Sequence, residues 1–384
     1  MHAYNKTDLV NKYVQQQAWE ALQTGCIDNE SFNKILQAYP SKLYTPNYFI
    51  RIALGLLTIV AVLCSALLFG LLSSVSSTQA ITSLLIILAV ICYITLEVVV
   101  KSKNYYNAGI DNILMSMVIL SVVSAFFVSD STPLVISIVT MFIALYLGLR
   151  FTDAFMVMVS YCCFFIFLFF LYLKAGDMAK TTAPLIMMAV SAIIYFVMKK
   201  LIDNNPTFIY WYCFKAVTFL TLVTFYASGN YYIVKELSNQ MFDLHLALHD
   251  PIPFSWIFWI FTLIIPPAYI IYGIIKKHFL VMRVGLGLTA ASIFTVKYYY
   301  TILPVEIEML IGGVILIAVS YALIKYLNTP KHGYTFDNIY KSNQDLLNAE
   351  ALIIAEAFNK KPATQSSGLY GGGSGGGGGA TGEW

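Results

Sequence analysis

Long apolar runs follow one another along most of this 384-residue sequence. Residues of the set AVILMFWYC make up 59% of the chain, only 11% of it is charged, and the mean hydropathy is +0.72. A soluble domain has about 45–50% apolar and about 25% charged residues, and a helix needs about 20 mostly apolar residues to cross a bilayer. The sequence therefore predicts an all-α, polytopic integral membrane protein in contact with the lipid bilayer.

We expect about ten spanning helices, arranged as consecutive hairpins in a bundle over residues 49–327. Even numbers of crossings return the chain to the side on which it began. The expected spans are residues 50–72, 80–100, 110–128, 132–149, 152–173, 183–200, 207–227, 254–275, 279–299 and 305–326.

The orientation follows from lysine and arginine, which concentrate in the loops on the inner side of a membrane. The segments on the side of the N-terminus hold Lys6, Lys12, Lys34, Lys42, Arg51, Lys101, Lys103, Arg150, Lys199, Lys200, Lys276, Lys277 and the cations of the C-terminal tail. The opposite side holds Lys174, Lys180 and Lys235, with Lys297 close by. This asymmetry predicts that both termini are cytoplasmic.

Polar segments flank the bundle. Residues 1–48 are expected to form a cytoplasmic hairpin of two amphipathic helices, with Gly25 ending the first and Asp28 capping the second. Residues 328–362 are expected to contain a cytoplasmic amphipathic helix. The glycine-rich residues 363–384 can bury too little apolar surface to order themselves, so we expect a flexible tail.

Four ionisable residues inside the spans are candidates for a functional cluster, because charge within a membrane is costly. Glu97, Asp111 and Asp153 lie near the inner ends of their spans. Lys215 lies deeper, roughly 12 Å along its helix at 1.5 Å per residue. Its ammonium can either extend back to the inner interface or pair with one of the three carboxylates and line a polar vestibule.

Pro266 and Pro267 fall in the middle of the eighth span. They remove the N–H groups that would satisfy the carbonyls of Thr262 and Leu263, which predicts a kinked helix. Broken helices mark binding sites in many transporters, but proline is also common in spanning helices with no such role. The sequence leaves both interpretations open.

His245 and His249 lie one helical turn apart in the outer loop, a spacing at which two imidazoles can meet one metal ion. The glutamate that a zinc peptidase carries between its two histidines is missing here. The leucines around them are also typical of an amphipathic helix at the membrane surface, which is the favoured interpretation.

Other classes of function find little support in the sequence. GxxxxGK[ST] does not occur, and GxSxG occurs only at residues 372–376 of the glycine-rich tail, where the sequence predicts no flanking strand and helix, so no catalytic residue or cofactor site can be named. The six cysteines show no CxxC spacing. A net charge of +3, dispersed along the chain, argues against a nucleic-acid partner.

The stretch from Trp19 to Leu72 resembles the start of bacterial membrane proteins grouped as "domain of unknown function 2157", which begin with a helical hairpin followed by many spans. The matching residues are Gly25, Ile27, Glu30, Ile35 and Tyr39, with Asp28 where the family has Ser or Thr. The sequence departs from the family after the first span, where Leu71-Leu72-Ser73-Ser74 replaces an Asn-Trp pair. The glycine-rich tail ending in Trp384 is also similar to tails of several bacterial membrane-anchored families. These resemblances imply a multi-span protein of a bacterial inner (cytoplasmic) membrane, and they imply no reaction.

Two functions from different classes remain. The favoured prediction is a non-enzymatic envelope scaffold or accessory subunit that binds a protein partner through its cytoplasmic ends and Trp384. The alternative is a secondary transporter or channel that uses the eighth span and the surroundings of Lys215. Convergence of the ionisable groups on one cavity would favour transport, and their dispersal to the rim would favour the scaffold.

Overall fold

The structure is a computed structural model that describes residues 3–72, 77–174, 176–203, 209–242, 247, 250–300 and 305–328. In these ranges the chain forms thirteen α-helices and no β-strand. The all-helical fold predicted from the sequence is therefore confirmed for the described residues. The predicted C-terminal amphipathic helix, the glycine-rich tail and both candidate metal ligands, His245 and His249, lie outside them.

The helices follow the apolar runs closely, with additional short helices outside them. Their bounds are α1 Lys6–Gln23, α2 Asn29–Ala38, α3 Tyr48–Leu72, α4 Thr78–Lys103, α5 Ile110–Val128, α6 Pro133–Phe151, α7 Ala154–Leu173, α8 Asp177–Ile202, α9 Trp211–Gly229, α10 Tyr231–Phe242, α11 Ser255–Ile275, α12 Phe279–Tyr299 and α13 Val305–Leu327.

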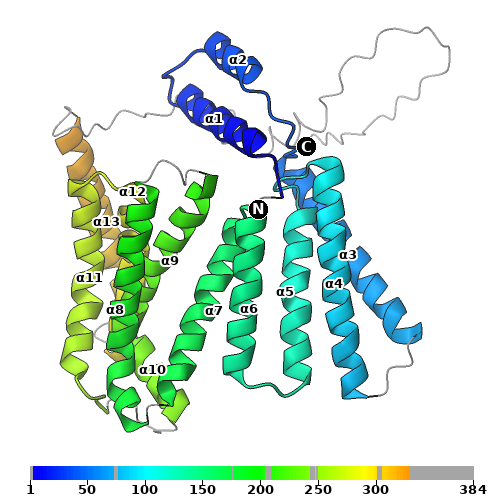
Figure 1. Cartoon of the computed structure of the whole chain (residues 1–384). Helices are drawn as coiled ribbons and strands as arrows, with labels where there is room; N and C mark the ends of the chain where they lie inside the picture. The colour runs from blue at the N-terminus through cyan, green and yellow to red at the C-terminus, as the bar shows by residue number, and fades with distance from the viewer. Residues whose placement is uncertain are drawn as a thin grey trace, which may run out of the picture.

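Four antiparallel pairs make up most of the array: α4 with α5, α6 with α7, α8 with α9, and α11 with α12. Figure 1 shows the pairs side by side, with α1 and α2 lying across one end of the array. We call this end the N-terminal face. Each pair is joined at this face, and the α6–α7 turn shows how tight the joints are. A Cβ atom on Gly148 would lie 3.0 Å from the Val157 backbone nitrogen, so only glycine permits this approach.

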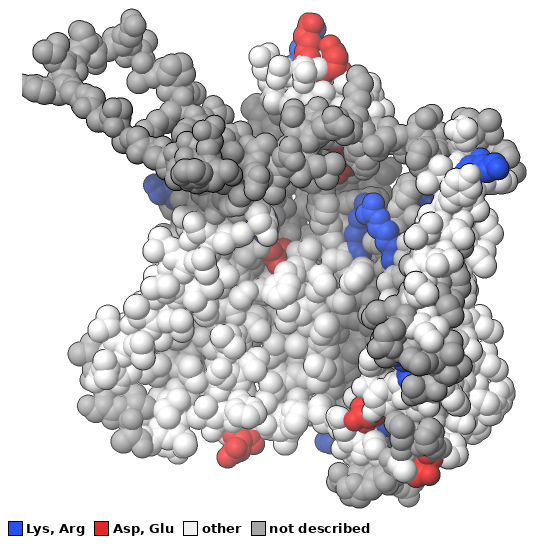
Figure 2. Space-filling view, turned by 180° about the vertical axis from the view of Figure 1, so that it is seen from behind, with Lys and Arg blue, Asp and Glu red and all other residues white. Residues whose placement is uncertain are grey.

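Eight of the helices are long and apolar enough to cross a membrane: α3 to α8, α11 and α12. Exposed leucine, isoleucine, valine and phenylalanine side chains cover their outer surfaces. Figure 2 shows a broad belt of uncharged residues between charged groups at the two ends of the molecule. This distribution indicates a lipid bilayer environment. Helices α9 and α13 also occupy predicted spans but are not among the eight.

The segment after α9 differs from the sequence prediction. The seventh span was predicted to begin at residue 207, but α9 begins at Trp211. A separate helix, α10, then precedes the outer loop. Asn230 explains the break, because its backbone is extended and its side-chain oxygen accepts a hydrogen bond from the Ile233 N–H at 3.1 Å. Asn230 therefore caps α10.

Candidate functional site

The N-terminal segment is inserted into the N-terminal face through Tyr4. Its side chain is only 7% exposed, and its hydroxyl donates a hydrogen bond to the Tyr105 carbonyl at 3.0 Å. The ring makes edge-to-face contacts with Tyr106 and Phe151, at centroid distances of 5.3 and 6.4 Å. Burial, reinforced by the charge of Asp111, raises the pKa of Tyr4. Tyr4 is thus a neutral, buried anchor between the ends of the helices.

Asp111 lies beneath this anchor, at the start of α5, and is 2% exposed. Its two carboxylate oxygens accept hydrogen bonds from the backbone N–H groups of Asn107 and Ala108, at 2.7 and 2.9 Å. Gly109, between these two residues and α5, adopts a φ of +93°, a conformation that favours glycine. The geometry gives Asp111 a structural role in closing the α4–α5 loop.

Asp153 is the second buried carboxylate at this face, 8% exposed, in the short turn between α6 and α7. It caps α7 by accepting a hydrogen bond from the Met156 N–H at 2.8 Å. Burial raises the pKa of Asp153, and the charge of Asp111 raises it further. The structure therefore brings Asp111 and Asp153 close enough to influence each other.

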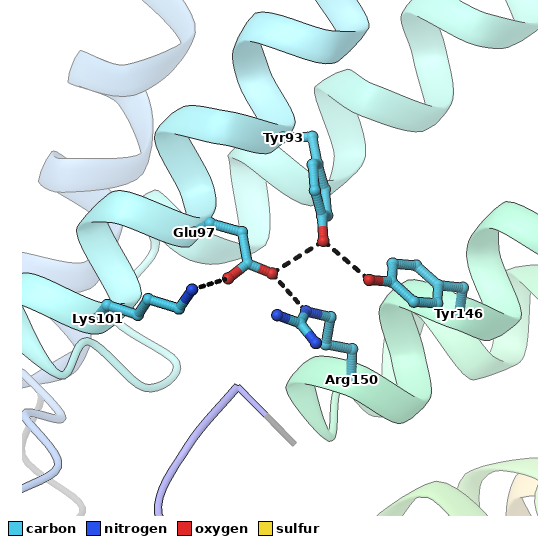
Figure 3. A network of polar contacts seen from close by, with 5 residues as sticks. All are labelled: Tyr93, Glu97, Lys101, Tyr146 and Arg150. Carbon is cyan, nitrogen blue, oxygen red and sulfur yellow. Dashed lines mark hydrogen bonds and ion pairs between the residues drawn. The ribbon is translucent and has the colours of Figure 1, made fainter. Parts of the chain in front are cut away.

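Glu97 belongs to a different network, which joins α4 to α6 (Figure 3). Its carboxylate accepts from the Arg150 guanidinium and forms an ion pair with Lys101 at 3.2 Å. The Tyr93 hydroxyl donates to Glu97 at 2.9 Å and contacts the Tyr146 hydroxyl at 2.9 Å. Glu97 and Arg150 side chains are 13% and 19% exposed, so the ion pair is partly buried. It stabilises the contact between the two hairpins.

Lys215 is not brought together with these carboxylates. Its side chain is exposed, and its ammonium lies 4.5 Å from the ring centroid of Trp211, one turn nearer the N-terminal face. The ion pairs found among the described residues connect Lys34 to Glu30 and Lys101 and Arg150 to Glu97. This geometry corresponds to the interfacial interpretation of Lys215, with a cation–π contact on a belt tryptophan.

The two prolines of the eighth span lie beside a buried polar cluster. α11 remains helical through Pro266 and Pro267. Because Pro266 has no backbone N–H, the carbonyl of Thr262 lacks its usual donor within the helix. The Ser292 hydroxyl of α12 donates to this carbonyl at 2.9 Å. Thr262 itself is fully buried, and its hydroxyl accepts a hydrogen bond from the Tyr231 N–H at 2.9 Å. The freed carbonyl thus connects α11 to α12.

Asn230 extends this cluster toward α9. Its amide nitrogen donates to the Tyr226 hydroxyl and to the Thr295 hydroxyl, both at 2.9 Å. Asn230 and Thr295 are each 1% exposed. These groups are neutral and satisfy one another, so the cluster fixes how α9, α10, α11 and α12 pack.

Lys235 is the buried cation on the far side of the molecule, 4% exposed. Its ammonium donates to the carbonyls of Ala247 and Asp250, at 2.9 and 2.7 Å, and lies 5.3 Å from the Tyr299 ring centroid. Burial lowers the pKa of Lys235. Its contacts hold the segment after α10 against the array.

Metal chemistry finds no site in the part of the chain that the structure describes, where no three His, Cys, Asp or Glu side chains gather. The pair His245 and His249 lies outside that part and stays a prediction.

Comparison with models of known protein families, with characterised proteins and with solved structures found no match. The resemblance of the first residues to the "domain of unknown function 2157" proteins therefore stays a prediction.

Several residues of these networks were missed in the sequence. Arg150 was counted only as a loop cation, although its position at the inner end of its span places it at the same depth as Glu97. Ser292 was also missed, although a carbonyl freed by Pro266 requires a donor from a neighbouring helix. Tyr4 carried no signal, because a single tyrosine in a polar segment is unremarkable.

Proposed function

We propose that this protein is a non-enzymatic scaffold or accessory subunit of a bacterial inner membrane, in which the α1–α2 hairpin is a fixed docking platform for a protein partner. One observation carries the proposal. The hairpin is anchored firmly through Tyr4 and the segment after α2, and it presents the exposed Trp19, which packs against Phe32.

The anchoring combines backbone pairing with burial. The Tyr44 N–H donates to the Asn104 carbonyl at 2.9 Å, and the Tyr106 N–H donates to the Tyr44 carbonyl at 3.1 Å. Leu9 and Leu43 join the same apolar core as Tyr4 and the ends of α4 to α7. A hairpin held in this way does not pay the ordering entropy of a free segment when it binds a partner.

The exposed side of the hairpin is suited to a protein contact. Trp19 is 50% exposed and lies against Phe32, with ring centroids 5.8 Å apart. A groove of about 660 Å³ beside it is lined by Trp19, Leu22 and Gln23 of α1, the turn residues Gly25 to Asp28, and Asn29 and Ser31 of α2. Tryptophan is enriched among residues that dominate binding energy at protein interfaces.

The proposal places this platform in the cytoplasm. The lysine and arginine asymmetry supports an orientation with both termini inside. The proposal has ten spans, which are the eight long apolar helices together with α9 and α13. Reporter fusions after residues 104 and 203 should then read as inside, and fusions after residues 130 and 240 as outside. A cytoplasmic reading after residue 240 would contradict the orientation of everything that follows α10.

We propose the tail as a second docking element, with Trp384 as its aromatic contact. Truncation after residue 364 should leave membrane insertion and thermal unfolding unchanged. Trp384→Ala alone should reproduce any loss of a partner seen on truncation. A truncated protein that no longer folds would show that the tail contributes to the body of the protein.

The transporter or channel remains the alternative function. The surroundings of Lys215 and the eighth span would carry it, and the dispersal of the ionisable groups weighs against it. Glu97 pairs with Arg150, Asp111 and Asp153 support turns at the N-terminal face, and Lys215 contacts Trp211. The carbonyl freed by Pro266 is already satisfied by Ser292, which supports a packing role for this region.

Photo-crosslinking in the native membrane tests the platform. A photoreactive phenylalanine in place of Trp19 should give a discrete protein adduct, whereas the same residue at Trp256, which is 64% exposed on α11, should not. Trp19→Ala should remove the partner from the purified complex while Trp256→Ala retains it. A complex that survives Trp19→Ala intact would refute the platform.

A further inference from the structure

A cavity of about 220 Å³ lies between α1 and the N-terminal face of the array. Five separate parts of the chain enclose it, and its two cations come from different ones: Lys12 from α1 and Arg51 from the first turn of α3. The linker contributes Thr45, the α4–α5 loop contributes Asn107, and α9 contributes Tyr212. We call it the Lys12–Arg51 pocket.

Both cations are held by neutral groups. The Lys12 ammonium donates to the Thr45 hydroxyl at 2.8 Å, and the Arg51 guanidinium donates to the Asn107 side-chain oxygen at 3.4 Å. Neither cation takes part in the ion pairs formed by the described residues. A guanidinium offers five N–H donors and an ammonium three, so most of their capacity is left for a ligand. Burial disfavours the charged ammonium and so lowers the pKa of Lys12. A bound anion would offset this cost of burying the charge.

The two buried carboxylates at the starts of α5 and α7 are engaged elsewhere. The charge of Arg51 acts on Asp153, but a carboxylate oxygen of Asp153 accepts a hydrogen bond from the Met156 N–H. Burial raises the pKa of Asp153. Both oxygens of Asp111 accept from backbone N–H groups of the α4–α5 loop. These two carboxylates therefore serve the turns beneath the pocket, and the pocket itself is lined by positive charge.

Apart from Gln16, the rest of the lining is apolar or aromatic, and it includes Leu9, Tyr13, Pro46 and Ile209. The pocket lies where α3 and α9 begin, which is the level of lipid headgroups for helices that cross a bilayer. An ammonium and a guanidinium can bind the oxygens of a phosphate group, and the apolar and tyrosine side chains beside them can contact a short carbon chain attached to it.

We propose that the Lys12–Arg51 pocket binds one phosphate monoester or diester, which joins the α1–α2 hairpin to the membrane array. The phosphate can belong to an anionic phospholipid headgroup or to a free phosphate compound, and both share the same contacts. Because Lys12 belongs to the hairpin and Arg51 to the array, the ligand adds a further link between the platform and the array. The proposal does not require the hairpin to have a protein partner.

Thermal unfolding of the full-length, delipidated protein in a neutral detergent tests the site. The probes are short-chain phosphatidylglycerol, the same diacylglycerol without its phosphate, inorganic phosphate, and sodium chloride at equal ionic strength. A ligand that binds only the folded state raises Tm with concentration. Phosphatidylglycerol should raise Tm where the diacylglycerol does not. A comparable rise with inorganic phosphate would identify a free phosphate compound as the source.

Two variants connect the response to the pocket. Lys12→Gln and Arg51→Gln should each weaken the response to the active probe by about tenfold, or ~1.4 kcal/mol. Lys34→Gln is the matched control, because Lys34 is a 72% exposed lysine of the same hairpin, and it should respond like the native protein. The proposal is overturned if no phosphate probe exceeds sodium chloride, or if Lys12→Gln keeps the full native response.

Discussion

Replacing Ser292 with alanine tests whether the carbonyl freed by Pro266 really connects α11 to α12. The Ser292 hydroxyl lies 2.9 Å from the Thr262 carbonyl oxygen, and the two residues are 7% and 0% exposed. Removing the hydroxyl leaves the buried Thr262 carbonyl without this donor, and an unsatisfied buried acceptor costs about 1–3 kcal/mol in proteins generally. Hydrogen bonds between membrane helices average about 0.6 kcal/mol and reach about 1.7. We therefore expect Ser292→Ala to lower the free energy of unfolding by about 1–2 kcal/mol.

A second substitution separates this hydrogen bond from ordinary packing. Pro266→Ala restores a backbone N–H four residues after Thr262, which can then satisfy the carbonyl within α11. In that background Ser292→Ala should cost less than half as much, which gives a coupling of about 1 kcal/mol between the two sites. Thr289→Ala is the control, because its hydroxyl donates to the Gly285 carbonyl of its own helix, and it should cost under about 0.5 kcal/mol.

Unfolding in mixed micelles with increasing dodecyl sulfate, followed by far-ultraviolet circular dichroism, gives the four free energies of this cycle. Equal costs of Ser292→Ala in the native and Pro266→Ala backgrounds would refute the reasoning. The same holds if Thr289→Ala proves as destabilising as Ser292→Ala, since the loss would then be one of general packing.

Three further outcomes follow from the N-terminal face. Burial raises the pKa of Asp153, so this group stabilises the fold most at low pH and loses that contribution as pH rises through its raised pKa. In thermal unfolding at a series of pH values, Asp153→Asn should therefore be more stable than the native protein near neutral pH. The gain should vanish below the ordinary pKa of about 3.9. Arg150→Gln should cost about 2 kcal/mol in thermal unfolding, because it removes the partly buried guanidinium that donates to Glu97, whereas Lys101→Gln, at a 65% exposed side chain, should stay under about 0.5. Tyr4→Ala should increase hydrogen exchange of α1 at least about tenfold without changing that of α5.

The positions of the long helices were predictable because each is a continuous apolar run with polar residues at its ends. The cap of α2 was predictable too, since the Asp28 side chain accepts from the Ser31 N–H at 3.2 Å. The separation of α10 from α9 was not predicted. Asn230 ends one helix and caps the next, but in the sequence it lies in a segment whose hydropathy gives no periodic signal. Its role depends on Thr295, which is distant in the chain.

The candidate site was harder to predict than the fold, because a sequence gives the depth of a residue in a span but not the direction of its side chain. Glu97, Asp111 and Asp153 lie near the ends of their helices at the N-terminal face, and the structure orients them toward different partners. The Glu97–Arg150 pair depends on the rotation of α4 relative to α6. Lys215 shows the same limit. Its side chain extends one helical turn back to Trp211, so its ammonium makes an interfacial contact and does not pair with the three carboxylates.

Two sets of polar groups lie at opposite ends of α9. Charged groups with unused capacity, such as Lys12 and Arg51, lie at the N-terminal face. The neutral cluster around Asn230 and Thr262 lies at the far end of α9, about 28 Å away along a helix of 19 residues. The neutral groups bond one another, so they determine how the helices pack, whereas the charged ones remain available to a ligand. Binding at the face would therefore act on the hairpin directly, without rearranging the membrane helices beneath it.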